Sequence, residues 1–315
     1  MSCESVHHKK ICIIYANCQG KGIEVFLKKH TLYNETTEII RLESYIFINE
    51  QLQLPVDLLK TASFFIYQPV DHKYGCYATD HVKSYLPEYC QSISFPYIFN
   101  NALWPLFEEA QGIFGQEVIS ELFDSGYSLK QVVDLFCDEA IDFKFEERFE
   151  LSLSILKEKE RMTDISVSDF IVCNLHKHKL FLTQNHPTSI VFVYCVNQIL
   201  RRMGFSELSE SLSYQVNEAS LPDCWPLSPY EKKFYGYQYK DNWQALHRER
   251  KDSNWYKFHL KIIGKIYFKN KILTPKLVFE RFYLRIMMEM GLRRRRGYLE
   301  ERYLDDQHFN QSRDY

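Results

Sequence analysis

Residues Lys10–Gly22 read KICIIYANCQGKG and contain the clearest strand-to-helix junction of the chain. The apolar run Ile11–Tyr15 has the length and composition of a buried β-strand. A short turn, Ala16–Gln19, follows it, and helical character resumes over Gly22–His30. Open α/β sheets build their ligand sites where a strand leads through a turn into a helix N-terminus. The stretch therefore predicts an α/β protein with a parallel-sheet core and a site at this turn.

The same order, an apolar strand followed by polar residues, recurs as far as about residue 100. We expect strands at Ile39–Leu42, Ala62–Tyr67 and Ile93–Phe99. Gln68 follows the second of these strands, and Asn100–Asn101 follow the third. Because the carboxyl ends of parallel strands meet at one edge of the sheet, these amides are expected near the first turn.

The rest of the chain is predicted to add many helices to this core. Residues 105–205 are mostly helical in pattern, and Ile190–Met203 is the most convincing buried helix. Residues 206–315 are polar and rich in aromatic side chains. We expect a catalytic domain over 9–205 and a helical, aromatic-rich extension over 206–315 that packs on the same domain or folds beside it.

Composition excludes several classes of function. The 315 residues carry a formal net charge of −2, which argues against a dedicated nucleic-acid binder. The nine cysteines form no C-x-x-C pair and no cluster with metal-ligand spacing, so we expect neither a disulfide framework nor a metal site. The sequence contains no signal-peptide pattern and no apolar window of membrane-spanning length, so we expect a cytoplasmic protein without a membrane span.

Cys18 is the first candidate for chemistry because it stands at the predicted helix start. The free N–H groups and the dipole of a helix N-terminus tend to lower a thiol pKa and so favour the nucleophilic thiolate. As a nucleophile, Cys18 would attack an acyl carbon. The alternative is that a small residue simply packs a tight turn there, since free cysteines are more often buried than reactive.

His186 is the second candidate, in the segment TQNHPTS that precedes the buried helix. An imidazole in a polar turn can act as a general base, although it can equally serve only to cap a helix. Together with Cys18 it makes a candidate Cys–His couple, which is recognised by geometry and not by order in the chain.

Polar side chains around these two residues form the rest of the predicted site. Five amides are expected to contact the substrate carbonyl: Asn17, Gln19, Gln68, Asn101 and Asn185. For the two strand-end positions, ordinary turn chemistry is the competing interpretation.

A family resemblance rests on four motifs that occur in order across about 9–205. These are Ala16–Gln19, Gln68–Pro69, the segment SFPYIFNN with the following Trp104–Pro105, and Thr183–Thr188. They resemble the WcbI-type polysaccharide-biosynthesis proteins, and the resemblance implies an acetyltransferase of capsule assembly. One departure is Ala16, where the family usually has glycine.

The resemblance implies that acetyl-CoA or another acyl-CoA is the donor and that a sugar or glycan hydroxyl is the acceptor. It makes Cys18 and His186 the catalytic residues and places the coenzyme near Gly20, Lys21 and Gly22, with Lys21 meeting its phosphates. No metal is implied.

A more distant resemblance, to the SGNH/GDSL hydrolases, adds a three-layer α/β fold and a rival activity. In that family an acidic residue stands three positions before the histidine, whereas here the position is Thr183, so a Cys–His dyad is the stronger form of the hypothesis. The rivals are an esterase or thioesterase that uses the same site, and a non-catalytic glycan- or nucleotide-binding module. The module would use aromatic side chains such as Trp225, Tyr230 and Trp243.

Overall fold

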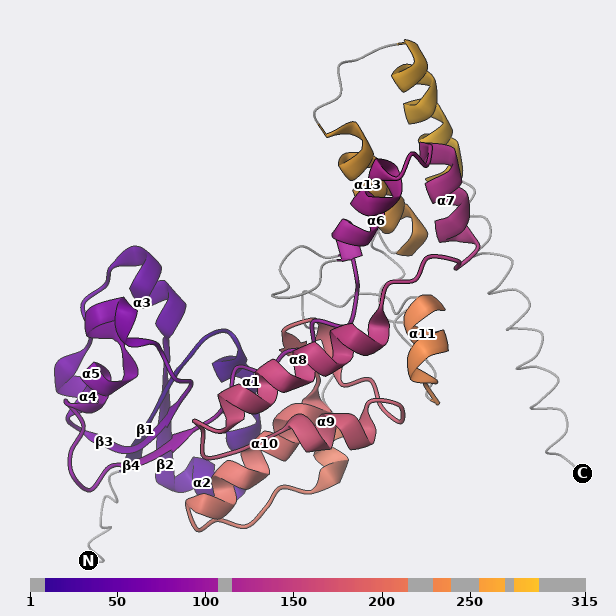
Figure 1. Cartoon of the computed structure of the whole chain (residues 1–315). Helices are drawn as coiled ribbons and strands as arrows, with labels where there is room; N and C mark the ends of the chain where they lie inside the picture. The colour runs from indigo at the N-terminus through magenta and orange to yellow at the C-terminus, as the bar shows by residue number, and fades with distance from the viewer. Residues whose placement is uncertain (1–8, 107–114, 215–228, 239–254, 270–274, 289–315) are drawn as a thin grey trace, which may run out of the picture. The chain divides into compact units, whose positions relative to one another are not determined.

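The computed structural model describes residues 9–106, 115–214, 229–238, 255–269 and 275–288 (Figure 1). The chain divides into two compact units. Unit 1 comprises Met1–Asn100 and Phe149–Asp223, and unit 2 comprises Asn101–Arg148 and Cys224–Tyr315. The units interleave along the chain, which is a different partition from the single boundary near 205 expected from the sequence. No helix among the described residues is long and apolar enough to span a membrane.

Unit 1 is built on a four-stranded sheet in the order β2-β1-β3-β4. The strands are β1 (Lys10–Ala16), β2 (Thr37–Glu43), β3 (Ala62–Tyr67) and β4 (Gln91–Ser94). All of the neighbouring pairs are parallel. With the many helices around it, this sheet confirms the α/β class predicted from the sequence.

Strand β1 is apolar from Ile11 to its end because both of its faces are covered there, as is usual in parallel sheets. Residues Ile13 and Tyr15 pack into a cluster with Leu59 and Val82 from the connections that follow β2 and β3. The opposite face of β1 carries Ile14 and Ala16 and lies against the first helix. Consecutive side chains of a strand point to opposite faces, so one apolar run supplies both cores.

Helices surround this sheet and continue into the second half of unit 1 (Figure 1). They are α1 (Gln19–Leu27), α2 (Thr31–Thr36), α3 (Ser44–Glu50), α4 (Val56–Leu59), η1 (His72–Tyr77), α5 (Thr79–Lys83), α8 (Phe145–Glu160, which belongs to unit 1 from Phe149), α9 (Ser168–Asn174), α10 (Ser189–Arg202) and η2 (Glu210–Tyr214). Between α9 and α10, β5 (Phe181–Thr183) and β6 (His186–Pro187) form a small antiparallel pair.

One predicted strand is shorter than expected. The apolar run 93–99 pairs only as far as Ser94, after which Phe95 N donates to Tyr67 O at 2.9 Å and the chain leaves the sheet. Pro96 explains the difference because it has no N–H to donate to a ladder. The following residues form a loop at the carboxyl edge of the sheet.

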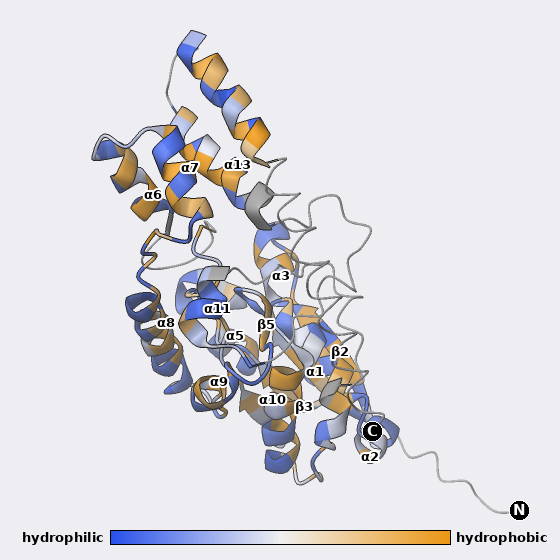
Figure 2. Ribbon diagram, turned by 90° about the vertical axis from the view of Figure 1, so that its right-hand side faces the viewer, coloured by the Kyte–Doolittle hydropathy of each residue, from blue (hydrophilic) through white to orange (hydrophobic). Residues whose placement is uncertain are grey.

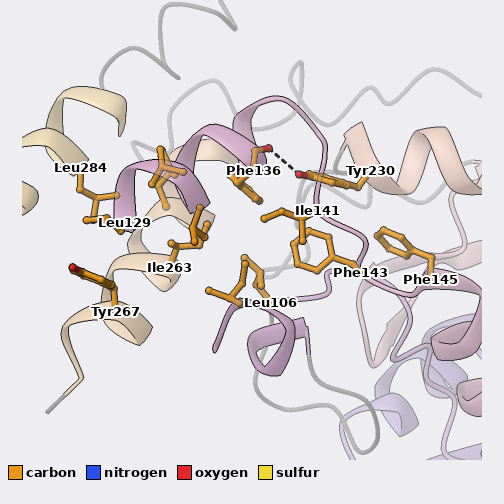
Figure 3. Packing of buried hydrophobic residues seen from close by; sticks show 14 of the residues in the cluster. Leu106, Leu129, Phe136, Ile141, Phe143, Phe145, Tyr230, Ile263, Tyr267 and Leu284 are labelled. Atoms are coloured by element: carbon orange, nitrogen blue, oxygen red, sulfur yellow. Dashed lines mark hydrogen bonds between the residues drawn. The ribbon is translucent and has the colours of Figure 1, made fainter. Parts of the chain in front are cut away.

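Unit 2 is helical, with α6 (Gly115–Asp124), α7 (Leu129–Cys137), α11 (Pro229–Tyr235), α13 (Trp255–Phe268) and a helix over 275–288. Its core is a cluster of buried apolar side chains (Figure 3) that includes Phe136, Phe143, Tyr230 and Ile263. Hydrophobic residues are frequent along α6, α7 and α13 (Figure 2). Each of these helices is amphipathic and buries its apolar face in this cluster.

Several aromatic side chains of the C-terminal part contribute to this core, whereas Phe234, Phe279 and Phe282 are exposed. Tyr230 is 6% exposed and packs against the rings of Phe136 and Phe143. Trp225 and Trp243, which the binding-module interpretation would use, lie outside the described residues.

Candidate functional site

The carboxyl ends of β1 and β3 lie at the switch point of the sheet. The chain passes from β1 to β2 on one side and then to β3 on the other, so the connections leave this edge in opposite directions. The loops after the two strands are joined there. Asn17 N donates to Gln68 Oε1 at 3.0 Å, and Gln68 N donates to Tyr15 O at 3.0 Å. Ligands of open α/β sheets bind at this topological position.

Cys18 stands at the start of a helix, as expected, and occupies the N-cap position because α1 begins at Gln19, earlier than the helix expected over Gly22–His30. The turn before the helix is fixed by Asn17, whose Oδ1 accepts from Gln19 N at 2.9 Å and whose carbonyl accepts from Gly20 N at 2.9 Å. The Cys18 side chain makes no capping bond to the helix backbone and is only partly buried. Its Sγ lies 3.7 Å from Nε2 of His186. The structure therefore brings together two residues that are 168 positions apart in the chain.

His186 reaches Cys18 because it begins the second strand of the β5–β6 pair. Thr183 and His186 face each other across that pair, and Gln184 and Asn185 form the two-residue turn between them. The turn is anchored to unit 1, since Asn100 N donates to Gln184 O at 2.8 Å. On its other side, His186 Nδ1 lies 2.6 Å from Thr183 Oγ1.

The side-chain amides of Gln19 and Gln68 form a buried hydrogen-bonded network below this pair. Gln19 Nε2 donates to the carbonyls of Ile98 and Asn185 at 2.6 and 2.7 Å, while Gln19 Oε1 accepts from Ile98 N. Gln68 Nε2 donates to Gln19 Oε1 at 2.9 Å and to Pro96 O at 3.2 Å. Each NH₂ group has two hydrogens, and in both amides the two hydrogens are donated to acceptors inside the protein.

This geometry differs from the expectation that Gln19 and Gln68 contact a substrate carbonyl. They are 1% and 6% exposed, and their hydrogens already have acceptors. What they do is connect the turn after β1, the end of β3, the 96–98 loop and the turn that carries His186. The sequence signal for such a role is a glutamine directly after an apolar strand or in the turn that follows it. A single sequence does not indicate which of these amides pair with each other.

Asn17 and Asn185 are placed differently from the two glutamines. Each is partly exposed, and each uses its side-chain oxygen as an acceptor, from Gln19 N and from Thr183 Oγ1 respectively. Within the described part of the chain, no hydrogen bond engages either Nδ2. Asn101, by contrast, belongs to unit 2, where its carbonyl accepts from Arg148 Nη2 at 2.8 Å.

The two glycines expected near a coenzyme are required by helix packing. A Cβ on Gly22 would lie 2.4 Å from Cζ of Phe192 in α10, and one on Gly20 would lie 3.1 Å from the Cβ of Ala16. Gly20 therefore allows α1 to approach the sheet, and Gly22 allows α10 to approach α1. Lys21, between them, is exposed on the first turn of α1.

Other thiols of unit 1 lie in different surroundings. Burial raises the pKa of Cys12 to about 12 and raises that of Cys195 as well, so both remain protonated in the core. Over the residues that the structure describes, no group of three or more His, Cys, Asp or Glu side chains could hold a metal ion.

A partly buried thiol beside an imidazole, at the switch point of a parallel sheet, defines the class of this protein. It is an α/β protein with a Cys–His pair at the carboxyl edge of its strands.

The family model of the polysaccharide biosynthesis enzyme WcbI matches residues 11–208. The chain therefore belongs to the WcbI family of polysaccharide biosynthesis enzymes, which confirms the resemblance seen in the sequence.

A solved structure of WcbI, described as a novel polysaccharide biosynthesis enzyme, has a similar fold with a TM-score of 0.56 and 15% sequence identity. The match covers 90% of this chain and 99% of that one. That structure is described as the native protein without a disulfide bond between CoA and one of its cysteines. No curated protein matches this chain in a sequence comparison.

Proposed function

We propose that this protein is a CoA-dependent O-acyltransferase that transfers an acetyl or related acyl group to a hydroxyl of a sugar or glycan. The observation that carries the proposal is the 3.7 Å approach of Cys18 Sγ to His186 Nε2 at the switch point of the sheet. Membership of a family of polysaccharide biosynthesis enzymes supports a sugar acceptor. The mention of CoA and a cysteine for the similar WcbI structure supports the donor.

In this proposal His186 is the general base, and its Nε2 takes a proton from one of two groups. In the covalent route it accepts the Cys18 proton, and Cys18 Sγ forms a thioester as the bond from the acyl carbon to the coenzyme sulfur breaks. His186 passes that proton to the departing coenzyme sulfur, which leaves as the free thiol. The sugar hydroxyl then loses its proton to His186, its oxygen attacks the acyl carbon, and His186 returns the proton to Cys18 Sγ as the thioester bond breaks. In the direct route His186 deprotonates the sugar hydroxyl, whose oxygen attacks the acyl-CoA carbon, and then gives the proton to the departing coenzyme sulfur, while Cys18 only lines the site.

The remaining predicted residues take roles that suit their placement. Asn17 and Asn185 are the amides whose Nδ2 groups are proposed to stabilise the developing oxyanion. Gln19 and Gln68 are proposed to hold the site together. Lys21 is an exposed cation at the start of α1, where a phosphate of the coenzyme would also meet the helix dipole. Acetyl-CoA supplies the activated acyl group as a substrate.

The same proposal sets the cellular context. A thiol nucleophile and a CoA donor both suit a reducing, cytoplasmic compartment, and an acylated glycan suits capsule assembly.

Calorimetric titration with acetyl-CoA under reducing conditions tests the proposal. We expect saturable binding in the micromolar range by the wild type and by Cys173→Ser, a control at an exposed cysteine. Incubation with acetyl-CoA and candidate sugars should then give an O-acylated product, and His186→Ala should reduce the rate by at least about 100-fold. Cys18→Ser should do the same in the covalent route only.

Two results would count against the proposal. Absence of binding up to millimolar acetyl-CoA would remove CoA as the donor. Release of free acid at an undiminished rate when no acceptor is present would instead identify an esterase or thioesterase at the same site.

A further inference from the structure

Thr183 contacts the side of His186 that faces away from Cys18. The two residues face each other across β5 and β6, and such facing residues place their side chains on the same side of an antiparallel pair. Thr183 Oγ1 is 2.6 Å from His186 Nδ1, and the threonine is 2% exposed. The contact is therefore short and largely shielded from water.

The hydrogen bonds around Thr183 determine which atom donates in this contact. A threonine hydroxyl carries one hydrogen. Thr183 Oγ1 donates that hydrogen to Asn185 Oδ1, 3.1 Å away, and a carbonyl oxygen can only accept. The hydroxyl therefore has only lone pairs to offer to the imidazole. It follows that His186 Nδ1 carries a hydrogen and donates it to Thr183 Oγ1.

This assignment fixes the other nitrogen of a neutral imidazole as the acceptor. His186 Nε2 then presents its lone pair on the side of the ring where Cys18 Sγ lies. In the opposite tautomer Nε2 would carry a hydrogen and could take no proton from a thiol or a hydroxyl.

We propose that Thr183, with its hydroxyl oriented by Asn185, is the positioning residue that keeps His186 in the Nδ1–H tautomer, so that Nε2 serves as the base. This inference rests on the proposed function for its purpose, but the tautomer itself is a property of the free protein. It gives a neutral residue the orienting role that an acidic residue plays in a Ser–His–Asp triad.

The matched variants are Thr183→Val, which keeps the shape and removes the hydroxyl, and Thr183→Ser, which keeps the hydroxyl. Nitrogen-15 NMR of histidine-labelled protein reports the tautomer directly. We expect the wild type and Thr183→Ser to show a protonated Nδ1 and a bare Nε2 at His186, and Thr183→Val to lose that preference. Asn185→Ala frees the Thr183 hydrogen, and we expect it to populate the Nε2–H form.

Alkylation of Cys18 by iodoacetamide at neutral pH is a second readout that needs no acyl donor. Loss of the partner that orients a metal-ligating histidine typically costs about 10–100-fold in affinity or activity, and we take the lower end as the guide for His186. We therefore expect Thr183→Val to slow alkylation about 10-fold or more and Thr183→Ser to restore most of the rate. The rate at Cys173 in the same samples is an internal control, because that thiol is exposed.

The outcomes separate this inference from the proposed function. A wild-type NMR pattern and a wild-type alkylation rate in Thr183→Val would overturn the role of Thr183, whatever the substrate is. If the wild type shows the Nδ1–H tautomer but neither binds acetyl-CoA nor transfers an acyl group, the proposed function fails and the tautomer assignment stands. Amide exchange over β5 and β6 shows whether the valine variant keeps its local fold.

Discussion

Gln19 in unit 1 and Tyr230 in unit 2 are both buried polar side chains, but the surrounding structure uses them differently. Gln19 is held by hydrogen bonds from both ends of its amide, to Ile98, Asn185 and Gln68. Tyr230 lies with its ring in the apolar cluster of unit 2, and its hydroxyl donates to Phe136 O at 2.9 Å (Figure 3).

The comparison indicates that the edge of unit 1 depends on hydrogen bonds, which are directional, whereas the core of unit 2 depends on filling its volume with apolar side chains. Hydrogen bonds fix the positions of the atoms that they join, and a buried network becomes costly when one member is lost. Apolar burial is not directional and tolerates small rearrangements. Positions at the edge of unit 1 that carries Cys18 and His186 are thus set more strictly than positions in the apolar cluster of unit 2.

The largest effect is expected for Gln19→Leu, which breaks the network in unit 1. The substitution leaves the carbonyls of Ile98 and Asn185, the Ile98 N–H and one hydrogen of Gln68 without their partner. Each unsatisfied buried group costs about 1–3 kcal/mol, so we expect a loss of roughly 4 kcal/mol in unfolding free energy. Hydrogen exchange measured by segment should show β1, β3 and the 96–98 loop losing protection.

The same substitution in unit 2 provides the matched control. Gln116 is partly buried and donates to Leu106 O at 2.9 Å, so Gln116→Leu should cost only about 1 kcal/mol. If the two variants lose equal stability, the contrast between a network and a local bond is wrong.

The second largest loss of unfolding free energy, about 2 kcal/mol, is expected for Gly22→Ala because the new Cβ would overlap the ring of Phe192. Gly20→Ala should cost less, since its nearest contact is 3.1 Å. In the double variant Gly22→Ala, Phe192→Ala, the loss should be clearly smaller than the sum of the two single losses. Urea unfolding measures all of these values. If Gly22→Ala keeps the wild-type stability but binds acetyl-CoA more weakly, Gly22 contacts the coenzyme and is not required by helix packing.

The sequence predicted most of the sheet because each strand carries its own signal. The run Ala62–Tyr67 is apolar except for Ser63 and is a strand with those bounds. The strand expected at 93–99 was too long, since its apolar residues continue past Pro96 into a buried loop. The short helices between residues 31 and 83 were not predicted, because four to seven residues are too few to show a helical period.

The site was predictable to the level of residue type and no further. A thiol at a helix start and a histidine in a polar turn can be found in a sequence, and parallel strands explain why their segments meet. The pairing of Gln19 with Gln68 depends on side-chain positions set by segments 49 residues apart. The same limit applies to Thr183, whose importance depends on a hydroxyl direction set by Asn185.

A smaller effect is expected for Tyr230→Phe in unit 2. The ring stays in the cluster, and the hydroxyl hydrogen that is shared between Phe136 O at 2.9 Å and Leu135 O at 3.4 Å is removed, so the loss should be about 1 kcal/mol. Tyr127→Phe, at an exposed tyrosine, should cost close to nothing. Hydrogen exchange over α7 and α13 should detect the first change. A loss as large as that of Gln19→Leu would mean that unit 2 also depends on a directional network.

The smallest effect concerns Asp164, which supports the end of β4 at the same edge of unit 1. Its Oδ2 accepts from both the N–H and the hydroxyl of Ser94, each at 2.7 Å. Partial burial opposes ionisation, but these bonds and the charges of Arg202 and Lys83 outweigh it, so the pKa of Asp164 lies below its ordinary value.

The sign of the pH dependence follows from that lowered pKa. The carboxylate stabilises the fold fully above the unfolded-state pKa, about 3.9, and the contribution is lost as pH falls through the lower folded-state value. Because Asp164 is mostly solvated, we expect Asp164→Asn to lose less than about 1 kcal/mol at pH 7. Urea unfolding at falling pH should show that the difference in unfolding free energy between Asp164→Asn and the wild type disappears only below about pH 4. Asp57→Asn, at a fully exposed carboxylate, should have the same unfolding free energy as the wild type at both neutral and acidic pH. A gap for Asp164→Asn that widens on acidification would contradict the stabilising role of this carboxylate, because a lowered pKa in the folded state can only add stability on the alkaline side of the transition.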